Sequence, residues 1–194
     1  MISCIVLSAG LSSRFGSPKA LASLNGQTVI EHLLHNLVLS CLDEIIIVLG
    51  AEAERIEPYI LKHKKAKVVY NKDYNFGQTS SFQVGLQSLD KNVNGFMLLP
   101  VDYPLVRSET IDFLISKFLK DSEKITIPVF ENKKGHPPIF PVSLKNEFLL
   151  LSADKGLNAV AHRYPEKIKL EEVLDFGVTQ TFNTSEEFKN LTSS

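Results

Sequence analysis

Short apolar runs alternate with segments of helical periodicity along the first two thirds of the chain. Five runs are predicted strands, and most are nearly continuous in apolar residues, as strands covered on both faces are: Ile2–Leu7, Glu44–Leu49, Lys67–Tyr70, Gly95–Leu99 and Lys124–Val129. Four helices are predicted between them: Thr28–Ser40, Ala53–His63, Thr79–Leu89 and Ser108–Leu119. This alternation implies right-handed crossovers, so we predict an α/β fold with a doubly wound, mostly parallel sheet.

The pattern changes after Val129. Glu131–Phe140 has turn residues followed by a short apolar run, which predicts a hairpin or a small mixed-sheet insertion rather than another crossover. Thr184 and Glu187 have capping-box spacing and predict a final helix. Because the chain shows no internal repeat, low-complexity tract or linker, residues 1–194 are predicted to form one domain.

Composition narrows the choice of partners. The net charge is −1, so no global field attracts nucleic acid or an anionic membrane, and any anion site must be built locally. The N-terminal apolar run is far too short to span a bilayer and follows no basic segment, so we expect a cytoplasmic protein. Cys4 and Cys41 lie in apolar runs and are predicted to be small core residues.

The loop after the first strand carries the strongest chemical signal. In open α/β sheets, ligands bind outside the carboxyl ends of the strands. Here Leu7–Lys19 reads L-S-A-G-L-S-S-R-F-G-S-P-K, in which exposed N–H groups can hold phosphate oxygens. Arg14 can bind a polyphosphate with two hydrogen bonds, and Lys19 adds a point charge. The spacing fits neither a P-loop nor G-x-G-x-x-G, and the residues alone leave open a plain glycine-rich turn with two surface cations.

The same string closely resembles the L-A-A-G-x-S-x-R-M-G-x-x-K signature of MobA-like NTP transferases. Within that group it is most similar to the molybdenum-cofactor cytidylyltransferases. The resemblance continues, in family order, to about Leu191 through Asn71–Leu86, Leu98–Leu105 (L-L-P-V-D-Y-P-L), Gly135–Pro137 (G-H-P) and Ser152–Gly156. It implies a Rossmann-like nucleotidyltransferase fold and transfer of a nucleoside monophosphate from an NTP to a phosphorylated small acceptor, with release of pyrophosphate.

The resemblance also implies a role for each matching residue. The nucleotide would contact Ser8, Ala9, Gly10, Ser12, Lys19, Gly77, Ser80 and Ser81. Lys19 would lie near the α-phosphate and Arg14 near the β- and γ-phosphates, while Asp102 would bind Mg²⁺ and His136 the acceptor. Simpler alternatives stay open: a turn aspartate, a serine N-cap beside a glycine turn, and a solvated turn histidine. Lys19 is expected to be exposed.

One segment departs from the family pattern. Thr181–Phe188 reads T-F-N-T-S-E-E-F where the family has D-x-D-T-P-E-D, so Asn183 stands in place of the last acid and offers a weaker metal ligand. Either one metal suffices, or another acid such as Asp175 contributes, or activity is reduced. Val101 and Tyr103 also replace the commoner glycine and glutamine beside the acid, which leaves the base and the acceptor undetermined.

The leading hypothesis is Mg²⁺-dependent transfer of CMP from CTP to molybdopterin. Two alternatives keep the chemistry and change the partners: GMP transfer to the same acceptor, or transfer to a sugar or alditol phosphate. A third is a nucleotide-binding regulatory protein without turnover, which only Asn183 favours. The leading hypothesis implies docking to a molybdoenzyme or its chaperone, and no nucleic acid or membrane as a partner.

Overall fold

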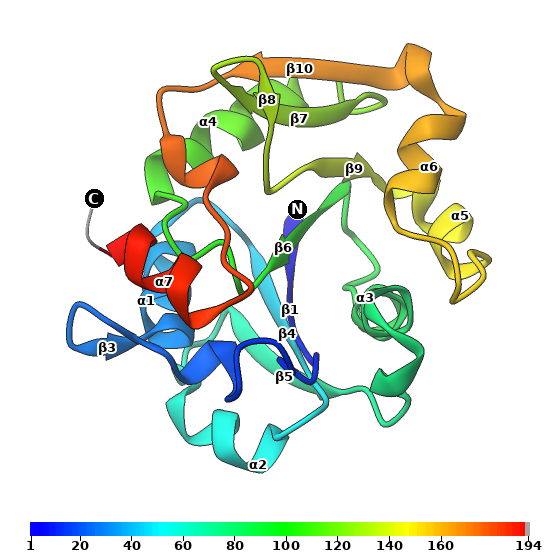
Figure 1. Cartoon of the computed structure of the whole chain (residues 1–194). Helices are drawn as coiled ribbons and strands as arrows, with labels where there is room; N and C mark the ends of the chain where they lie inside the picture. The colour runs from blue at the N-terminus through cyan, green and yellow to red at the C-terminus, as the bar shows by residue number, and fades with distance from the viewer. Residues whose placement is uncertain (193–194) are drawn as a thin grey trace.

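The computed structural model describes residues 1–192, so the last two residues of the predicted domain lie outside the described part. A single twisted sheet of eight strands runs through the molecule (Figure 1). Seven strands follow the order β10-β7-β9-β6-β1-β4-β5, and β8 pairs with β7. The predicted α/β fold class is therefore confirmed.

The parallel half of the sheet contains four of the predicted strands. They are β1 (Ile2–Ser8), β4 (Glu44–Leu49), β5 (Ala66–Tyr70) and β6 (Gly95–Pro100). β1 lies between β4 and β6 and pairs in parallel with both. β1 is central and buried along its whole length. The loop that carries the strongest chemical signal in the sequence follows its carboxyl end.

The other half of the sheet is mixed. β9 (Ile139–Pro141) lies antiparallel between β6 and β7 (Ile125–Phe130), and β8 (Lys133–Lys134) forms a hairpin with β7. The predicted insertion at Glu131–Phe140 is confirmed. The edge strand β10 (Ile168–Glu172) pairs in parallel with β7 and was not predicted, because its I-K-L-E-E sequence lacks a clear apolar run.

Helices cover both faces of the sheet (Figure 1). One face carries α1 (Val29–Leu39), α4 (Ser108–Leu119) and α7 (Ser185–Thr192), and the other carries α3 (Gln78–Gln87), α5 (Lys145–Leu149) and α6 (Asn158–Arg163). Alternation along the strands feeds both cores. In β1, for example, Cys4 and Val6 join the core under α1, whereas Ile5 and Leu7 join the core under α3.

The two predicted capping boxes have different outcomes. At α1, the Thr28 hydroxyl accepts from the Glu31 N–H at 3.3 Å and the Glu31 carboxylate accepts from the Thr28 N–H at 2.8 Å, which completes the box. At α7, the Thr184 hydroxyl accepts from the Glu187 N–H at 3.2 Å. The Glu187 carboxylate, however, accepts from the N–H of Asn183 rather than Thr184, so this box is displaced by one residue.

Two predictions are wrong. The helix predicted at Ala53–His63 is only α2 (Ala53–Ile56), followed by the 3₁₀ turn η2 (Glu57–Tyr59). Pro58 ends the α-helix because its ring has no N–H to donate and its bulk clashes with the preceding turn. Cys4 is buried as predicted, but Cys41 is exposed in the turn after α1.

The remaining short elements connect these layers. They are η1 (Lys19–Leu21), the hairpin β2 (Ser23–Leu24) and β3 (Gln27–Thr28), and the 3₁₀ turns η3 (Tyr74–Phe76), η4 (Val142–Leu144), η5 (Pro165–Lys167) and η6 (Phe176–Thr179). Within residues 1–192, no helix has both the length and the apolar character needed to cross a membrane.

Candidate functional site

A cleft of about 340 Å³ opens at the carboxyl ends of β1 and β6. The loop after β1 forms one wall, the start of α3 forms the opposite wall, and Asp102 lies at the end of β6. The nucleotide-binding residues predicted from the sequence that line this cleft are Ser8, Ala9, Gly10, Ser12, Lys19, Gly77 and Ser81. The structure thus gathers seven of the eight into one site.

The loop after β1 folds around Ser12. Its backbone has φ of 51°, in the left-handed region, and its carbonyl accepts from the N–H groups of Phe15 at 2.9 Å and Gly16 at 3.1 Å. The Ser12 hydroxyl also accepts from the N–H of Lys19 at 3.2 Å. A Cβ placed on Gly10 would meet nothing within 4 Å of the described chain, so the backbone of this residue is open to the cleft that it lines.

The start of α3 forms the opposite wall. Gly77 has φ of 92° and ψ of −168°, a backbone conformation that is open only to glycine. It is also the N-cap of the helix, without a side-chain cap, so the serine N-cap alternative does not hold. Ser81 lines the cleft, whereas the Ser80 hydroxyl donates to the carbonyls of Asp73 and Gly77. Ser80 is the predicted nucleotide contact that does not line the cleft.

Lys19 is held between two oxygen acceptors. Its ammonium lies 2.8 Å from Asp102 Oδ2 and 3.0 Å from Asn183 Oδ1. Beneath it, the Phe182 ring centroid lies 5.4 Å from Nζ. The Lys19 side chain is only 14% exposed, so the expectation that it would be exposed is wrong. The contact with the C-terminal segment, which the local sequence could not indicate, covers it.

Arg14 lies at the outer edge of this arrangement. It is exposed and does not line the cleft, and its Nη2 donates to Asn183 Oδ1 at 3.0 Å. The amide oxygen of Asn183 therefore accepts from both cations that the sequence predicted to bind phosphate. The protein as a whole has a net charge of only −1, but two cations and the carboxylate of Asp102 gather beside the carboxyl ends of β1 and β6.

In the described part of the chain, Asp102 has one carboxylate oxygen bound to Lys19 and one that is free. Its Oδ1 is buried and has no hydrogen-bond partner in the described chain, while Oδ2 binds Lys19. No group of three or more His, Cys, Asp and Glu side chains within residues 1–192 could hold a metal ion. One free carboxylate oxygen fits Mg²⁺, which takes most of its ligands from phosphate and water, whereas the nearby amide oxygen of Asn183 already accepts from Arg14 and Lys19.

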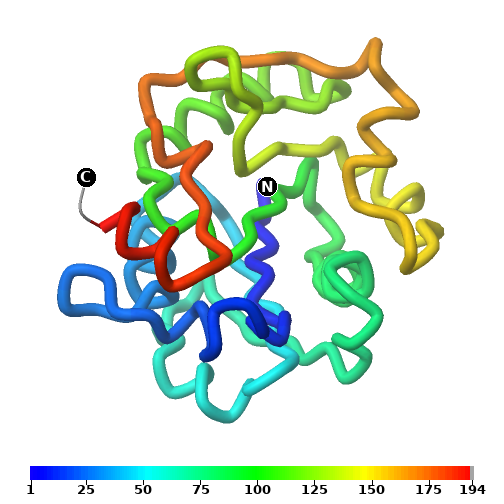
Figure 2. The backbone as a smooth tube through the Cα atoms, viewed as in Figure 1, coloured from blue at the N-terminus to red at the C-terminus, as the bar shows by residue number. Residues whose placement is uncertain are grey.

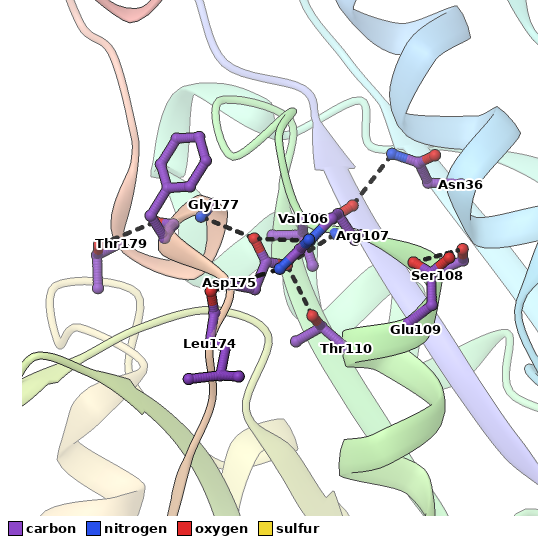
Figure 3. Close-up of polar contacts among 11 residues, drawn as sticks. Asn36, Val106, Arg107, Ser108, Glu109, Thr110, Leu174, Asp175, Gly177 and Thr179 are labelled. Atoms are coloured by element: carbon purple, nitrogen blue, oxygen red, sulfur yellow. Dashed lines mark hydrogen bonds and ion pairs between the residues drawn. The ribbon is translucent and has the colours of Figure 1, made fainter. Parts of the chain in front are cut away.

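Asp175 does not supply the missing acid. Its side chain is 1% exposed, and Oδ2 accepts from the Arg107 N–H at 3.0 Å and the Thr110 hydroxyl at 2.7 Å. Oδ1 accepts from the Gly177 N–H at 2.9 Å and lies 3.4 Å from Arg107 Nε (Figure 3). With both oxygens occupied, Asp175 ties η6 to the start of α4, and the suggestion that it helps to bind a metal is wrong.

His136 lines a neighbouring pocket of about 310 Å³ rather than the cleft itself. Its ring packs on Tyr103, with 4.5 Å between centroids, and its Nδ1 lies 3.2 Å from the Leu98 carbonyl. Burial lowers the pKa of His136 below its ordinary value, although the Leu98 carbonyl and Asp102 act in the opposite direction. The neutral ring donates from Nδ1 to Leu98, which leaves Nε2 as an acceptor.

Sequence reasoning missed several side chains of the site. Tyr74, Asn75 and Gln78 line the cleft, and Gln78 also lines the His136 pocket, which makes the two cavities neighbours. All three fall inside the Asn71–Leu86 segment. The sequence therefore indicated the segment but not these three side chains. Phe182, which lies under Lys19, directly precedes Asn183, and no sequence pattern indicated a role for it.

Comparison with known proteins identifies the family. The sequence model of the MobA-like NTP transferase domain matches residues 4–168. The chain belongs to this family. The resemblance first seen in the loop after β1 is therefore confirmed, and the matched region contains Arg14, Lys19, Asp102 and His136 but not Asn183.

A curated relative agrees with this family, and solved structures share the fold. A "Probable molybdenum cofactor guanylyltransferase" of Bacillus cereus is 30% identical over 131 residues, which is 67% of this chain and 62% of the relative. The match thus spans less than two thirds of that protein. The crystal structure of Rv0371c from Mycobacterium tuberculosis is 25% identical and superposes with a TM-score of 0.86 over 100% of this chain and 98% of its own. A manganese complex of Rv0371C, 24% identical over the same shares, has a TM-score of 0.80.

Proposed function

We propose that this protein transfers a nucleoside monophosphate from an NTP to the phosphate of a molybdopterin-type acceptor and releases pyrophosphate. The observation that carries the proposal is the contact of Lys19 with Asp102 and Asn183 at the mouth of the cleft. A cation, a carboxylate and a loop of small residues with exposed N–H groups are the groups that a triphosphate and its metal require.

The reaction needs positioning and charge rather than a protein nucleophile. An oxygen of the acceptor phosphate attacks the α-phosphorus, a new P–O bond forms, and the bond to the pyrophosphate oxygen breaks. Two of the three N–H bonds of the Lys19 ammonium are directed to Asp102 and Asn183, which leaves one for a phosphate oxygen. Lys19 can thus stabilise the charge that develops at the α-phosphate while keeping its position. Arg14, at the rim, suits the β- and γ-phosphates.

Asp102, with Asn183 as a weaker second ligand, would hold Mg²⁺. The unpartnered Oδ1 of Asp102 would supply one oxygen, and phosphate oxygens and water would supply most of the rest. The Asn183 amide oxygen, which accepts from Arg14 and Lys19, would join the ion only by giving up one of these contacts. When bound, the ion neutralises triphosphate charge and so favours attack at phosphorus and departure of pyrophosphate.

The His136 pocket suits the ring system of the acceptor. Its walls are largely apolar, and the neutral Nε2 of His136 can accept a hydrogen bond from a ring N–H. Gln78 lines both this pocket and the nucleotide cleft, so an acceptor held here has a short path for its phosphate to the α-phosphorus. This arrangement supports the acceptor role predicted for His136.

The donor base is the point on which the relatives favour the alternative hypothesis. The curated relatives are named as probable molybdenum cofactor guanylyltransferases, which supports GTP rather than CTP as the donor. The cytidylyl prediction rests on the G-H-P segment, on Asn71–Leu86 and on the smaller pocket that a pyrimidine needs, and it stays a prediction. We propose GTP as the preferred donor.

The test is pyrophosphate release with each of the four NTPs and purified molybdopterin, beside a sugar phosphate and an alditol phosphate. We expect the highest kcat/KM with GTP and molybdopterin, loss of turnover in EDTA, and recovery with Mg²⁺ or Mn²⁺. Asp102→Asn should show a lower kcat under the same conditions. A preference for CTP would restore the cytidylyl hypothesis, and turnover only with a sugar or alditol phosphate would refute the acceptor. NTP binding without turnover for any acceptor would indicate a regulatory protein.

A further inference from the structure

Three phenylalanine rings join the loop after β1 to the C-terminal segment. Phe15 lies in the loop, Phe182 precedes α7, and Phe188 lies on α7. The ring centroids are 5.3 Å apart for Phe15 and Phe182, 5.8 Å for Phe15 and Phe188, and 4.6 Å for Phe182 and Phe188. Each ring thus contacts the other two, at separations typical of favourable aromatic pairs. The backbone trace shows the C-terminal segment returning to lie beside the N-terminal loop (Figure 2).

Polar contacts from the same segment reach the loop's cations. Asn183 Oδ1 accepts from Arg14 and from Lys19, both at 3.0 Å. The Ser185 hydroxyl donates to the Phe15 carbonyl at 3.3 Å. Residues 182–188 therefore contact Arg14, Phe15 and Lys19, the three largest polar or aromatic side chains of the loop.

The loop has little else to hold it. Its internal backbone hydrogen bonds converge on Ser12, and most residues between Gly10 and Ser17 are exposed. Leu11, its one aliphatic side chain, is 63% exposed. A segment with few buried apolar contacts opens at a low free-energy cost. Besides the contact of Lys19 with Asp102, the position of Arg14 and Lys19 then depends on the contacts made by residues 182–188.

We propose that Phe188 is a positioning residue of the nucleotide site: through Phe15 and Phe182, it holds the loop after β1 in the arrangement that binds an NTP. Phe188 is not among the residues that line the cleft, and it lies beyond residue 168, where the family match ends. A site that is correctly arranged for only part of the time binds its ligand more weakly by that fraction. The choice of an NTP as ligand rests on the proposed function, whereas the effect on the loop does not.

The test is Phe188→Ala in the full chain. We expect the Kd and KM for Mg²⁺-bound GTP to rise about tenfold, which corresponds to about 1.4 kcal/mol, with a smaller change in kcat. Hydrogen exchange of the amides between Gly10 and Lys19 should become faster. Phe188→Leu, which keeps an apolar contact, should recover part of both effects.

Tyr164→Ala is the matched control. Tyr164 is also a partly buried aromatic residue, but it packs into the core on the other face of the sheet. Tyr164→Ala should lower the Tm while leaving the Kd and the amide hydrogen exchange of the loop after β1 unchanged. Equal effects of the two substitutions, or wild-type Kd and loop exchange in Phe188→Ala, would overturn the proposal. If the wild-type protein binds no NTP, the proposed function fails and the exchange comparison still decides the role of Phe188. If Phe188→Ala does not fold, Phe188→Leu gives the same comparison with a smaller shift.

Discussion

Lys19 Nζ lies 2.8 Å from Asp102 Oδ2, which joins the loop after β1 to the end of β6 at the cleft that both residues line. The pair is separated by 83 positions in the sequence, and both side chains are largely buried. Because Asp102 Oδ1 stays free of hydrogen bonds in the described chain, the carboxylate can hold Lys19 with one oxygen and a metal with the other.

Lys19→Ala should lower kcat on the order of 10²-fold, as loss of a preorganised charge partner at a transferring phosphoryl group does. Its burial adds a second effect, because Asp102 loses its partner and the free energy of unfolding should fall by about 1–3 kcal/mol. Lys19→Met keeps the apolar stem over Phe182 and separates the loss of charge from the loss of packing. Steady-state kinetics and urea unfolding measure the two effects. Wild-type turnover in both variants would show that the loop is not the phosphate site.

Asp102→Asn should raise the Mg²⁺ concentration needed for half-maximal turnover and lower kcat, because it removes the proposed anionic ligand and keeps the shape of the side chain. Asn183→Asp is the reciprocal change and should lower that Mg²⁺ concentration with equal or higher turnover. Titration of activity with Mg²⁺ tests both variants. If neither substitution changes the Mg²⁺ dependence, these two residues do not form the metal site.

Asp175→Ala should destabilise the fold by about 3 kcal/mol or more without altering the Mg²⁺ dependence of the variant that remains folded. The carboxylate accepts from the buried Thr110 hydroxyl and Gly177 N–H and from the partly buried N–H of Arg107, and its removal leaves these donors unpaired (Figure 3). Asp112→Ala is the control: Asp112 accepts an exposed hydrogen bond from the Cys41 N–H, and the substitution should cost about 1 kcal/mol. A weakened metal response in Asp175→Ala would contradict its structural role.

His136 should make the protein sensitive to mild acid. Because burial lowers the pKa of His136 in the folded chain, the unfolded chain binds more protons as the pH falls through about 6.5. Stability contributed by the neutral ring is therefore present above that pH and is lost as the pH drops toward the folded-state pKa. His136→Asn keeps a donor for the Leu98 carbonyl and removes the titration. The drop in unfolding free energy between pH 7.5 and pH 5.5 should be smaller in this variant, and an unchanged drop would refute the assignment.

The buried strands, the longer helices and the location of the site could be predicted from the sequence. Apolar runs such as Glu44–Leu49 are local patterns. A nearly continuous apolar run of this length is typical of a strand that is covered on both faces. The capping box at Thr28 and Glu31 likewise sets the start of α1 through residues that are neighbours in the chain. Prediction was weaker where two local signals competed. The helical periodicity of Ala53–His63 favours one long helix, but Pro58 limits it to the short helix α2 and the turn η2.

The sequence by itself determined the parallel sheet, the loop of small residues after β1, and the family to which the chain belongs. Only the tertiary structure decided that Asn183 contacts Lys19 from 164 positions away, that Phe182 lies beneath it, and that Asp175 is occupied elsewhere. The physical reason is range. Hydrophobic periodicity and caps act over a few residues, whereas the partner of a charged side chain depends on how distant segments pack. That packing is fixed by the whole core and not by any one stretch of chain.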